Sequence, residues 1–164
     1  EDIMIILIEG ADGSGKSTLL NRLSEIGFKT MTAPIPNRNM YEKWNKLVYN
    51  SIYYGENYIF DRSFISEIIY RVIDGRNSYI SLGQVCELLK FSKIILCETP
   101  TQFEDSIARG ETNITTIENA ELIRHKYRDF IKMVNKLEKV PYIVYNWKVD
   151  SISKAIHFIN NKRR

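Results

Sequence analysis

An eight-residue stretch near the start of the chain, GADGSGKS at residues 10–17, most constrains what this protein can fold into and bind. It fits the pattern G-x-x-x-x-G-K-[ST] without a substitution, and it lies between a strand-like apolar run at 3–9 and a helix-like run at 17–23. In that context the glycines let backbone N–H groups surround an anion, and the helix N-terminus adds its positive dipole end. The sequence therefore predicts a phosphate-binding loop, or P-loop, for a nucleoside triphosphate rather than an incidental glycine-rich turn.

The side chains at the end of this loop have separate expected roles. We expect Lys16 to reach the β- and γ-phosphates of ATP and the Ser17 hydroxyl to bind Mg²⁺. The predicted nucleotide-binding residues are Gly10, Ala11, Asp12, Gly13, Ser14, Gly15, Lys16, Ser17 and Thr18.

The length of 164 residues predicts a single domain, and the net charge of +3 suits anionic nucleotides without by itself indicating nucleic acid. No apolar run approaches the length of about 20 residues that spans a bilayer, and the start lacks a signal peptide pattern. We therefore expect a cytoplasmic protein (in the host cytoplasm if it is viral) without a membrane partner. We interpret residues 1–3 as an added remnant or part of a longer fragment, and residues 161–164 as a frayed tail. Cys86 and Cys97 are expected to be buried free thiols.

Strand-like and helix-like segments alternate along the whole chain. Continuous apolar runs, such as residues 93–98, are typical of strands that are buried on both faces of a parallel sheet. The pattern predicts a doubly wound α/β domain, in which helices flank both faces of a five-stranded parallel sheet. The expected strands are 3–9, 28–32, 58–60, 93–98 and 142–145, and the expected helices are 17–23, 39–53, 63–73, 81–89, 102–108, 117–139 and 151–160.

A second candidate site follows the third predicted strand, at Asp61, Arg62 and Ser63. In open parallel sheets ligands bind beyond the carboxyl ends of the strands, so we expect Asp61 to face the P-loop. A carboxylate there can hold Mg²⁺ or accept a proton from an attacking oxygen, and Arg62 can clamp an acceptor phosphate. The alternative is an ion pair between Asp61 and Arg62 at the surface. Glu98, at the end of the fourth predicted strand, is a candidate to hold Mg²⁺ through water.

Residues 61–70, DRSFISEIIY, resemble the D-R-[YF]-x-x-S-x-x-A-Y stretch of thymidylate kinases. Ser63 departs from that stretch and instead resembles the E-R-S of deoxynucleoside kinases, in which the glutamate is the general base. Residues 35–38, IPNR, are similar to the F-P-x-R of thymidylate kinases. The positions that match the family are Arg38, Asp61, Arg62, Ser66 and Tyr70.

The resemblance implies a P-loop kinase that transfers the γ-phosphoryl group of ATP, with Mg²⁺, to a deoxynucleoside monophosphate such as dTMP. It implies that Gly13, which is an arginine in some relatives, leaves a positive charge to be supplied by a short lid at 109–117, where Arg109 matches the first lid arginine. By the same resemblance the catalytic residues are Lys16, Asp61, Arg62 and Arg109, and the substrate-binding residues are Asp12, Arg38, Arg62, Ser66 and Tyr70.

The chain also departs from thymidylate kinases in ways that leave the acceptor open. Only 22 residues, positions 39 to 60, separate Arg38 from Asp61, and the lid lacks the extra arginines of the family. An alternative is a kinase that acts on a hydroxyl group, in a deoxynucleoside or at a modified base or an end in DNA. Nucleic acid is the less favoured substrate. A nucleotide-dependent switch or ATPase is a further alternative, and a homodimer is compatible with the sequence.

Several other side chains favour packing or solvent over a role in a site. Aromatic residues at 39–53 could stack on a nucleobase, but packing of the helix against the sheet is favoured for each. The isolated histidines disfavour a zinc site. Arg124 and Arg128 are expected on a solvated helix face, with a lid-side role for Arg124 as the alternative. The aromatic residues are Tyr41, Trp44, Tyr49 and Tyr53, and the histidines are His125 and His157.

Overall fold

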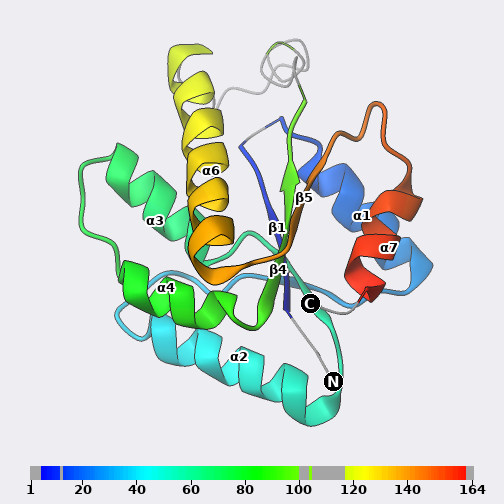
Figure 1. The fold of residues 1–164 in the computed structure, drawn as a ribbon, viewed down its shortest axis with the longest axis horizontal. Coiled ribbons are helices and arrows are strands. Elements are labelled where there is room, and N and C mark those ends of the chain that lie inside the picture. The colour runs from blue at the N-terminus through cyan, green and yellow to red at the C-terminus, as the bar shows by residue number, and fades with distance from the viewer. Residues whose placement is uncertain (1–4, 12, 100–103, 105–116, 162–164) are drawn as a thin grey trace.

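The computed structural model describes residues 5–11, 13–99, 104 and 117–161 (Figure 1), with the backbone alone at 117–120. Asp12, most of the predicted helix at 102–108, most of the predicted lid with Arg109, and residues 162–164 therefore lie outside the described residues. The strands are β1 (Ile5–Glu9), β2 (Thr30–Thr32), β3 (Tyr58–Asp61), β4 (Ser92–Cys97) and β5 (Tyr142–Tyr145). The helices are α1 (Lys16–Ile26), α2 (Met40–Tyr54), α3 (Phe64–Ile73), α4 (Leu82–Leu89), α6 (Ile117–Glu138) and α7 (Ile152–Asn160).

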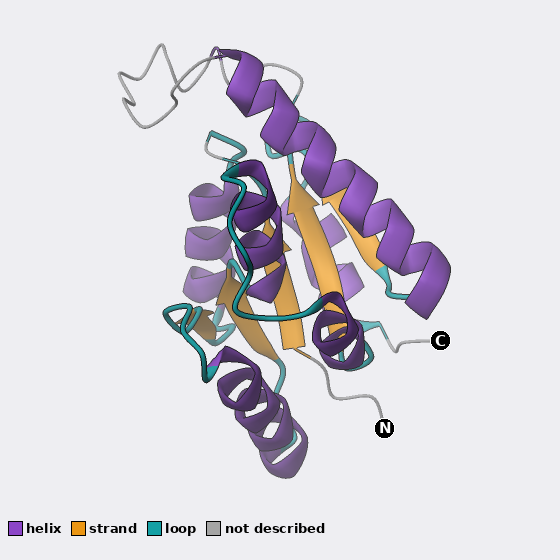
Figure 2. Cartoon of the chain, turned by 90° about the vertical axis from the view of Figure 1, so that its left-hand side faces the viewer, coloured by secondary structure: helices purple, strands orange, loops and turns teal. Residues whose placement is uncertain are grey.

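All five strands are parallel, in the order β2-β3-β1-β4-β5, which confirms the predicted sheet. Figure 2 shows the strands of this sheet between helices. The register pairs Ile8 of β1 with Asp61 of β3, and Glu9 of β1 with Leu96 of β4. The carboxyl ends of these three strands therefore lie together at one edge of the sheet. This edge is where the P-loop leaves β1.

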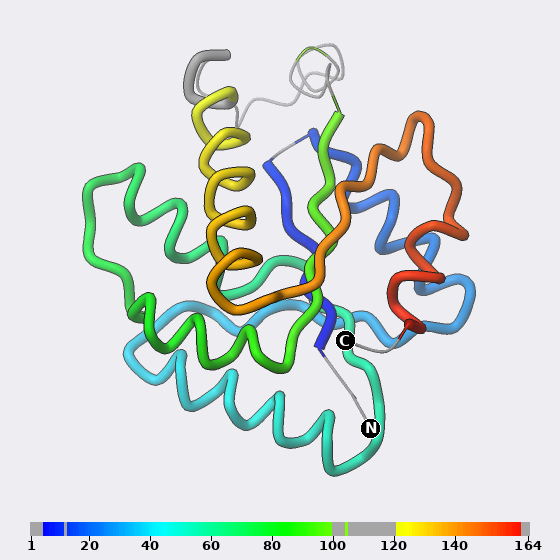
Figure 3. Tube along the Cα trace, viewed as in Figure 1, coloured from blue at the N-terminus to red at the C-terminus, as the bar shows by residue number. Residues whose placement is uncertain are grey.

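The strand β1 supplies alternate side chains to two separate cores, because successive residues of a strand point to opposite faces. Ile5 and Leu7 pack in the core under α2, α3, α4 and α6, while Ile6 and Ile8 pack in the core under α1 and α7. All four side chains are fully buried. The first and last helices, α1 and α7, lie side by side on their face of the sheet (Figure 3). Helices thus cover both faces of the sheet, as the alternating pattern predicted.

The predicted helix ends differ in how well they match the structure. α1 runs to Ile26, three residues beyond the predicted end at 23, and it ends at Gly27, whose φ of 111° is the left-handed conformation that glycine favours. Ser81 caps α4 as predicted, since its Oγ accepts from the Gln84 N–H and Gln84 accepts from the Ser81 N–H. In the part of the chain that the structure describes, no helix is long and apolar enough to cross a membrane.

The aromatic residues of α2 divide into two groups. Trp44 is fully buried and makes edge contacts with the rings of Phe60 at 4.8 Å and Phe64 at 5.1 Å, so packing is confirmed for it. Tyr41 also packs against this core. The expectation of packing is wrong for Tyr49 and Tyr53, which are 67% and 71% exposed and stack on each other. Positions 49 and 53 are four residues apart and share the outer face of the helix.

Candidate active site

The P-loop has the backbone conformation that its glycines predict. Gly10, Gly13 and Gly15 have φ angles of 151°, 77° and 87°, in the region that other residues rarely adopt. A Cβ atom on Gly10 would lie 2.5 Å from the carbonyl oxygen of Cys97 in β4. The loop therefore leaves β1 so close to the neighbouring strand that only glycine fits at this position.

An ion pair joins the P-loop to the end of β3. Lys16 Nζ lies 3.2 Å from Asp61 Oδ1, and the Lys16 side chain is only 11% exposed. This confirms the prediction that Asp61 faces the P-loop. The alternative pairing of Asp61 with Arg62 at the surface is wrong, because Arg62 turns into the protein toward Tyr127 of α6, where its Nη1 lies 3.5 Å from the Tyr127 hydroxyl.

A small polar hollow of about 220 Å³ lies where α1 begins, and Ser17 and Asp61 both line it. The other lining residues include Asn21, Thr30 and Thr32. Mg²⁺ in phosphoryl-transfer enzymes is held by one or two carboxylates, hydroxyls, waters and substrate phosphates. The hydroxyl of Ser17 and the carboxylate of Asp61 have the chemistry that such an ion needs.

A second, larger cavity of about 540 Å³ lies on the other side of Asp61, between the ends of β2 and β3 and the start of α3. Arg62 lines it in a left-handed conformation, with a φ of 65°, and its guanidinium lies 5.5 Å from the centre of the Tyr70 ring. The lining residues are Thr32, Ala33, Pro34, Ile35, Pro36, Met40, Asp61, Arg62, Ser63, Ser66, Glu67 and Tyr70. The structure thus brings together four of the five matches to thymidylate kinases. The fifth, Arg38, is exposed and is not among the described residues that line this cavity.

A buried carboxylate that the sequence motifs did not predict lies at the centre of this site. Glu9, the last residue of β1, is fully buried, and its two oxygens accept hydrogen bonds from the hydroxyls of Ser63 at 2.7 Å and Ser66 at 2.6 Å. Burial raises the pKa of Glu9, while the two serine hydroxyls and the charge of Arg62 oppose that rise. The signal in the sequence is a single acidic residue that ends an otherwise apolar strand.

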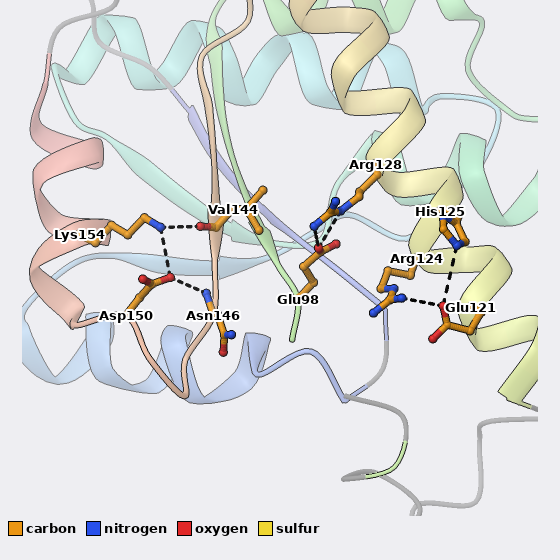
Figure 4. Close-up of polar contacts among 9 residues, drawn as sticks. All are labelled: Glu98, Glu121, Arg124, His125, Arg128, Val144, Asn146, Asp150 and Lys154. Atoms are coloured by element: carbon orange, nitrogen blue, oxygen red, sulfur yellow. Dashed lines mark hydrogen bonds and ion pairs between the residues drawn. The ribbon is translucent and has the colours of Figure 1, made fainter. Parts of the chain in front are cut away.

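A third cavity, of about 500 Å³, lies between α6 and the ends of β4 and β5. Glu98 lines it and faces Arg128 of α6 (Figure 4). The buried carboxylate of Glu98 accepts hydrogen bonds from Arg128, one of them from Nε at 2.7 Å. Arg124 donates to Glu121 at 2.7 Å and lines the same cavity. Arg128 is half-exposed on its helix, as predicted, but it also neutralises the buried carboxylate of Glu98. The role of Glu98 in holding Mg²⁺ through water stays a prediction.

Trp147, in the loop after β5, packs directly on the P-loop, a contact that the sequence did not indicate. A Cβ atom on Gly15 would lie 2.0 Å from Trp147 Cδ1. Asp150 holds this loop by accepting from the Asn146 N–H at 2.8 Å and from Lys154 at 3.2 Å (Figure 4), and the first of these bonds lowers the pKa of Asp150. The loop after β5 and the P-loop therefore support each other.

Both cysteines are free thiols, as predicted, but only Cys97 is fully buried. Burial raises the pKa of Cys97 to about 12, although the charge of Lys16 opposes the rise. We expect one equivalent of a thiol reagent to react quickly at pH 8 with Cys86, and the second only after unfolding. Cys86→Ser should abolish the fast reaction, which is measured by absorbance. Equal reaction rates for both thiols in the native protein would contradict this expectation.

No family model and no curated protein sequence matches the chain. Several solved structures, however, are similar to the chain. The YorR protein of Bacillus subtilis, in complex with phosphorylated GDP, shares 19% identity over 95% of both chains with a TM-score of 0.71. Deoxyadenosine kinase of M. mycoides with dCMP and dCDP shares 21% identity over 95% of this chain and 96% of that one, with a TM-score of 0.52. The same enzyme with dATP shares 20% identity over 96% of this chain and 100% of that one, with a TM-score of 0.53. The fold is that of the P-loop kinases.

Proposed function

We propose that the protein transfers the γ-phosphoryl group of ATP to a deoxynucleoside monophosphate such as dTMP. The observation that carries this proposal is the position of Asp61. Its carboxylate pairs with Lys16 of the P-loop, and it lines both the hollow beside Ser17 and the larger cavity that contains Arg62. The donor loop and a cavity with a guanidinium group therefore meet at one carboxylate, as a transfer between two bound phosphates requires.

The residues of the site divide into a donor set and an acceptor set. Lys16 and the P-loop backbone bind the β- and γ-phosphates, and Arg62 binds the acceptor phosphate in line with them. Ser17 and Asp61 would hold Mg²⁺, which when bound neutralises charge on the transferring phosphoryl group. Arg109, outside the described residues, is the expected source of further positive charge during transfer. No covalent intermediate on the protein is needed.

Two features favour a hydroxyl group as the alternative acceptor. Ser63 follows Asp61 and Arg62, as a serine follows the glutamate and arginine of deoxynucleoside kinases, and it lines the larger cavity. Two of the solved structures with this fold are of an enzyme named for a deoxynucleoside. In this alternative Asp61 accepts the proton of the attacking hydroxyl.

The test of the proposal is the release of ADP from ATP and Mg²⁺ in a coupled assay with a panel of deoxynucleoside monophosphates, deoxynucleosides and oligonucleotides. We expect the monophosphates to stimulate ADP release. Stimulation by deoxynucleosides or oligonucleotides alone would show that the proposed monophosphate kinase activity is wrong. Equal ADP release with and without every acceptor would instead indicate an ATPase or a nucleotide-dependent switch.

Asp61→Asn distinguishes a phosphate acceptor from a hydroxyl acceptor. A phosphate acceptor is already ionised, so we expect kcat to fall by about 10–100-fold through weaker metal binding and positioning. A hydroxyl acceptor needs a base, and its turnover should fall below detection. The measurement is kcat at saturating ATP and acceptor. Asp74→Asn is the control, because Asp74 lies in an exposed pair with Arg76, and it should leave kcat unchanged.

A further inference from the structure

A series of hydrogen bonds leads from Glu9 through neighbouring hydroxyl groups to Arg62. Ser66 has one hydroxyl proton, and it gives that proton to Glu9 Oε2 at 2.6 Å. The Tyr127 hydroxyl lies 2.8 Å from Ser66 Oγ and also hydrogen-bonds Glu9, and because the Ser66 proton goes to Glu9, the Tyr127 hydroxyl acts as a donor to this pair. The oxygen of Tyr127 then offers its lone pairs to Arg62 Nη1, at 3.5 Å. Glu9, which accepts at both carboxylate oxygens, therefore sets the direction of each hydrogen bond up to the guanidinium.

Glu9 also acts on the backbone around Arg62. Ser63, which follows Arg62, donates its hydroxyl proton to Glu9 Oε1 and accepts from the Ile65 N–H at the start of α3. The Arg62 N–H donates to the carbonyl oxygen of Ile8 at 2.9 Å. The last two residues of β1 therefore hold Arg62 in a left-handed conformation, with a φ of 65°, that is uncommon for residues other than glycine.

We propose that Glu9 is a positioning residue that sets the Arg62 guanidinium in the acceptor cavity, through Ser63 on one side and through Ser66 and Tyr127 on the other. Since Glu9 directly precedes Gly10, the same strand end carries the P-loop. Glu9 thereby holds the acceptor-binding group at a set place relative to the donor loop. The proposal rests on the proposed function in one respect, namely that the ligand of Arg62 is the acceptor phosphate.

Two nearly isosteric substitutions separate this role from simple support of the core. Glu9→Gln places an N–H₂ donor against one of the two serine hydroxyls and leaves only one oxygen to accept from the other. Tyr127→Phe removes the link to Arg62 and leaves Glu9 and both serines in place. We expect each to raise the Kd of the acceptor about tenfold, the size of effect that follows the loss of a hydrogen bond to a charged group. The Kd of ADP should stay within about twofold.

The experiment is a double-mutant cycle, in which dTMP is titrated by calorimetry into the protein loaded with ADP and Mg²⁺. If Glu9 acts through Tyr127, Glu9→Gln should weaken dTMP binding about tenfold in the natural background but at most about threefold in the Tyr127→Phe background. The remainder would reflect the path through Ser63. Equal effects in both backgrounds, or a matching loss of ADP binding, would overturn the proposal.

Two further arms keep the test decisive. If Glu9→Gln does not fold, Ser66→Ala takes its place, since it breaks the same series of hydrogen bonds at the next residue. The effect of Ser66→Ala on dTMP binding should also be smaller in the Tyr127→Phe background. An unchanged effect would overturn the proposal. If the assay panel identifies an acceptor other than dTMP, that acceptor is titrated. Failure to find any acceptor would overturn the proposed function and this inference together, whereas equal effects in both backgrounds overturn this inference alone.

Discussion

Lys16→Met is expected to lower kcat by about three orders of magnitude while the protein stays folded. Lys16 is the cationic side chain of the P-loop, and it lies at the end of the loop that faces Asp61. Removal of one preorganised group that stabilises developing charge typically costs about 10²–10³-fold in kcat, and cationic groups in phosphoryl transfer contribute about 10³–10⁵-fold. The measurement is the initial rate of ADP release with saturating ATP and the best acceptor of the panel.

The control for this substitution is Lys29→Met. Lys29 lies 3.6 Å from Glu56, and both side chains are more than half exposed, so kcat should not change. The ion pair of Lys16 with Asp61 is itself partly exposed, and we expect its loss to change the free energy of unfolding by no more than about 1 kcal/mol. A decrease in kcat of less than tenfold would contradict the donor role of Lys16.

Gly10→Ala is expected to lower the free energy of unfolding by about 3 kcal/mol or more and to abolish tight ATP binding. The new Cβ would lie 2.5 Å from the backbone oxygen of Cys97 and 2.7 Å from Ser14 Oγ, at a φ of 151°. Strain of this kind costs about 1–3 kcal/mol, and the clash adds to it because the contact is with the backbone of a paired strand. The measurement is the midpoint of urea unfolding, together with ATP binding by calorimetry.

Gly27→Ala is the matched control for the close contact at Gly10. Gly27 also has a positive φ, 111°, but nothing lies within 4 Å of the Cβ that it would gain. It should therefore show only the conformational cost of about 1–2 kcal/mol and keep its affinity for ATP. Equal destabilisation by the two substitutions would mean that the contact with Cys97 has no energetic consequence.

Much of the site could be predicted from short-range patterns. The eight residues of the P-loop carry their geometry in their own glycines. The position of Asp61 follows from a general property of parallel sheets, since strand ends meet at one edge. The ion pair between Lys16 and Asp61 is the direct result of these two rules.

Other contacts could not be predicted, because they depend on how side chains from distant segments pack. Arg38 matches a family position, yet it is exposed and is not among the described residues that line the larger cavity. Trp147 packs on Gly15, although no spacing in the sequence relates the two residues. The same holds for Tyr49 and Tyr53, since the face that α2 buries is set by its contact with the sheet.

The sequence by itself determined the P-loop, the parallel sheet and the place of Asp61 at its edge, because each follows from local conformation or from the order of strands. Only the tertiary structure decided how Arg62 is held. The serine hydroxyls that reach Glu9 are 54 and 57 residues away along the chain, and Tyr127 lies 61 residues beyond Ser66. A buried carboxylate accepts whichever donors the packed elements bring to it, and only the packing of α3 and α6 against the end of β1 brings these hydroxyls there.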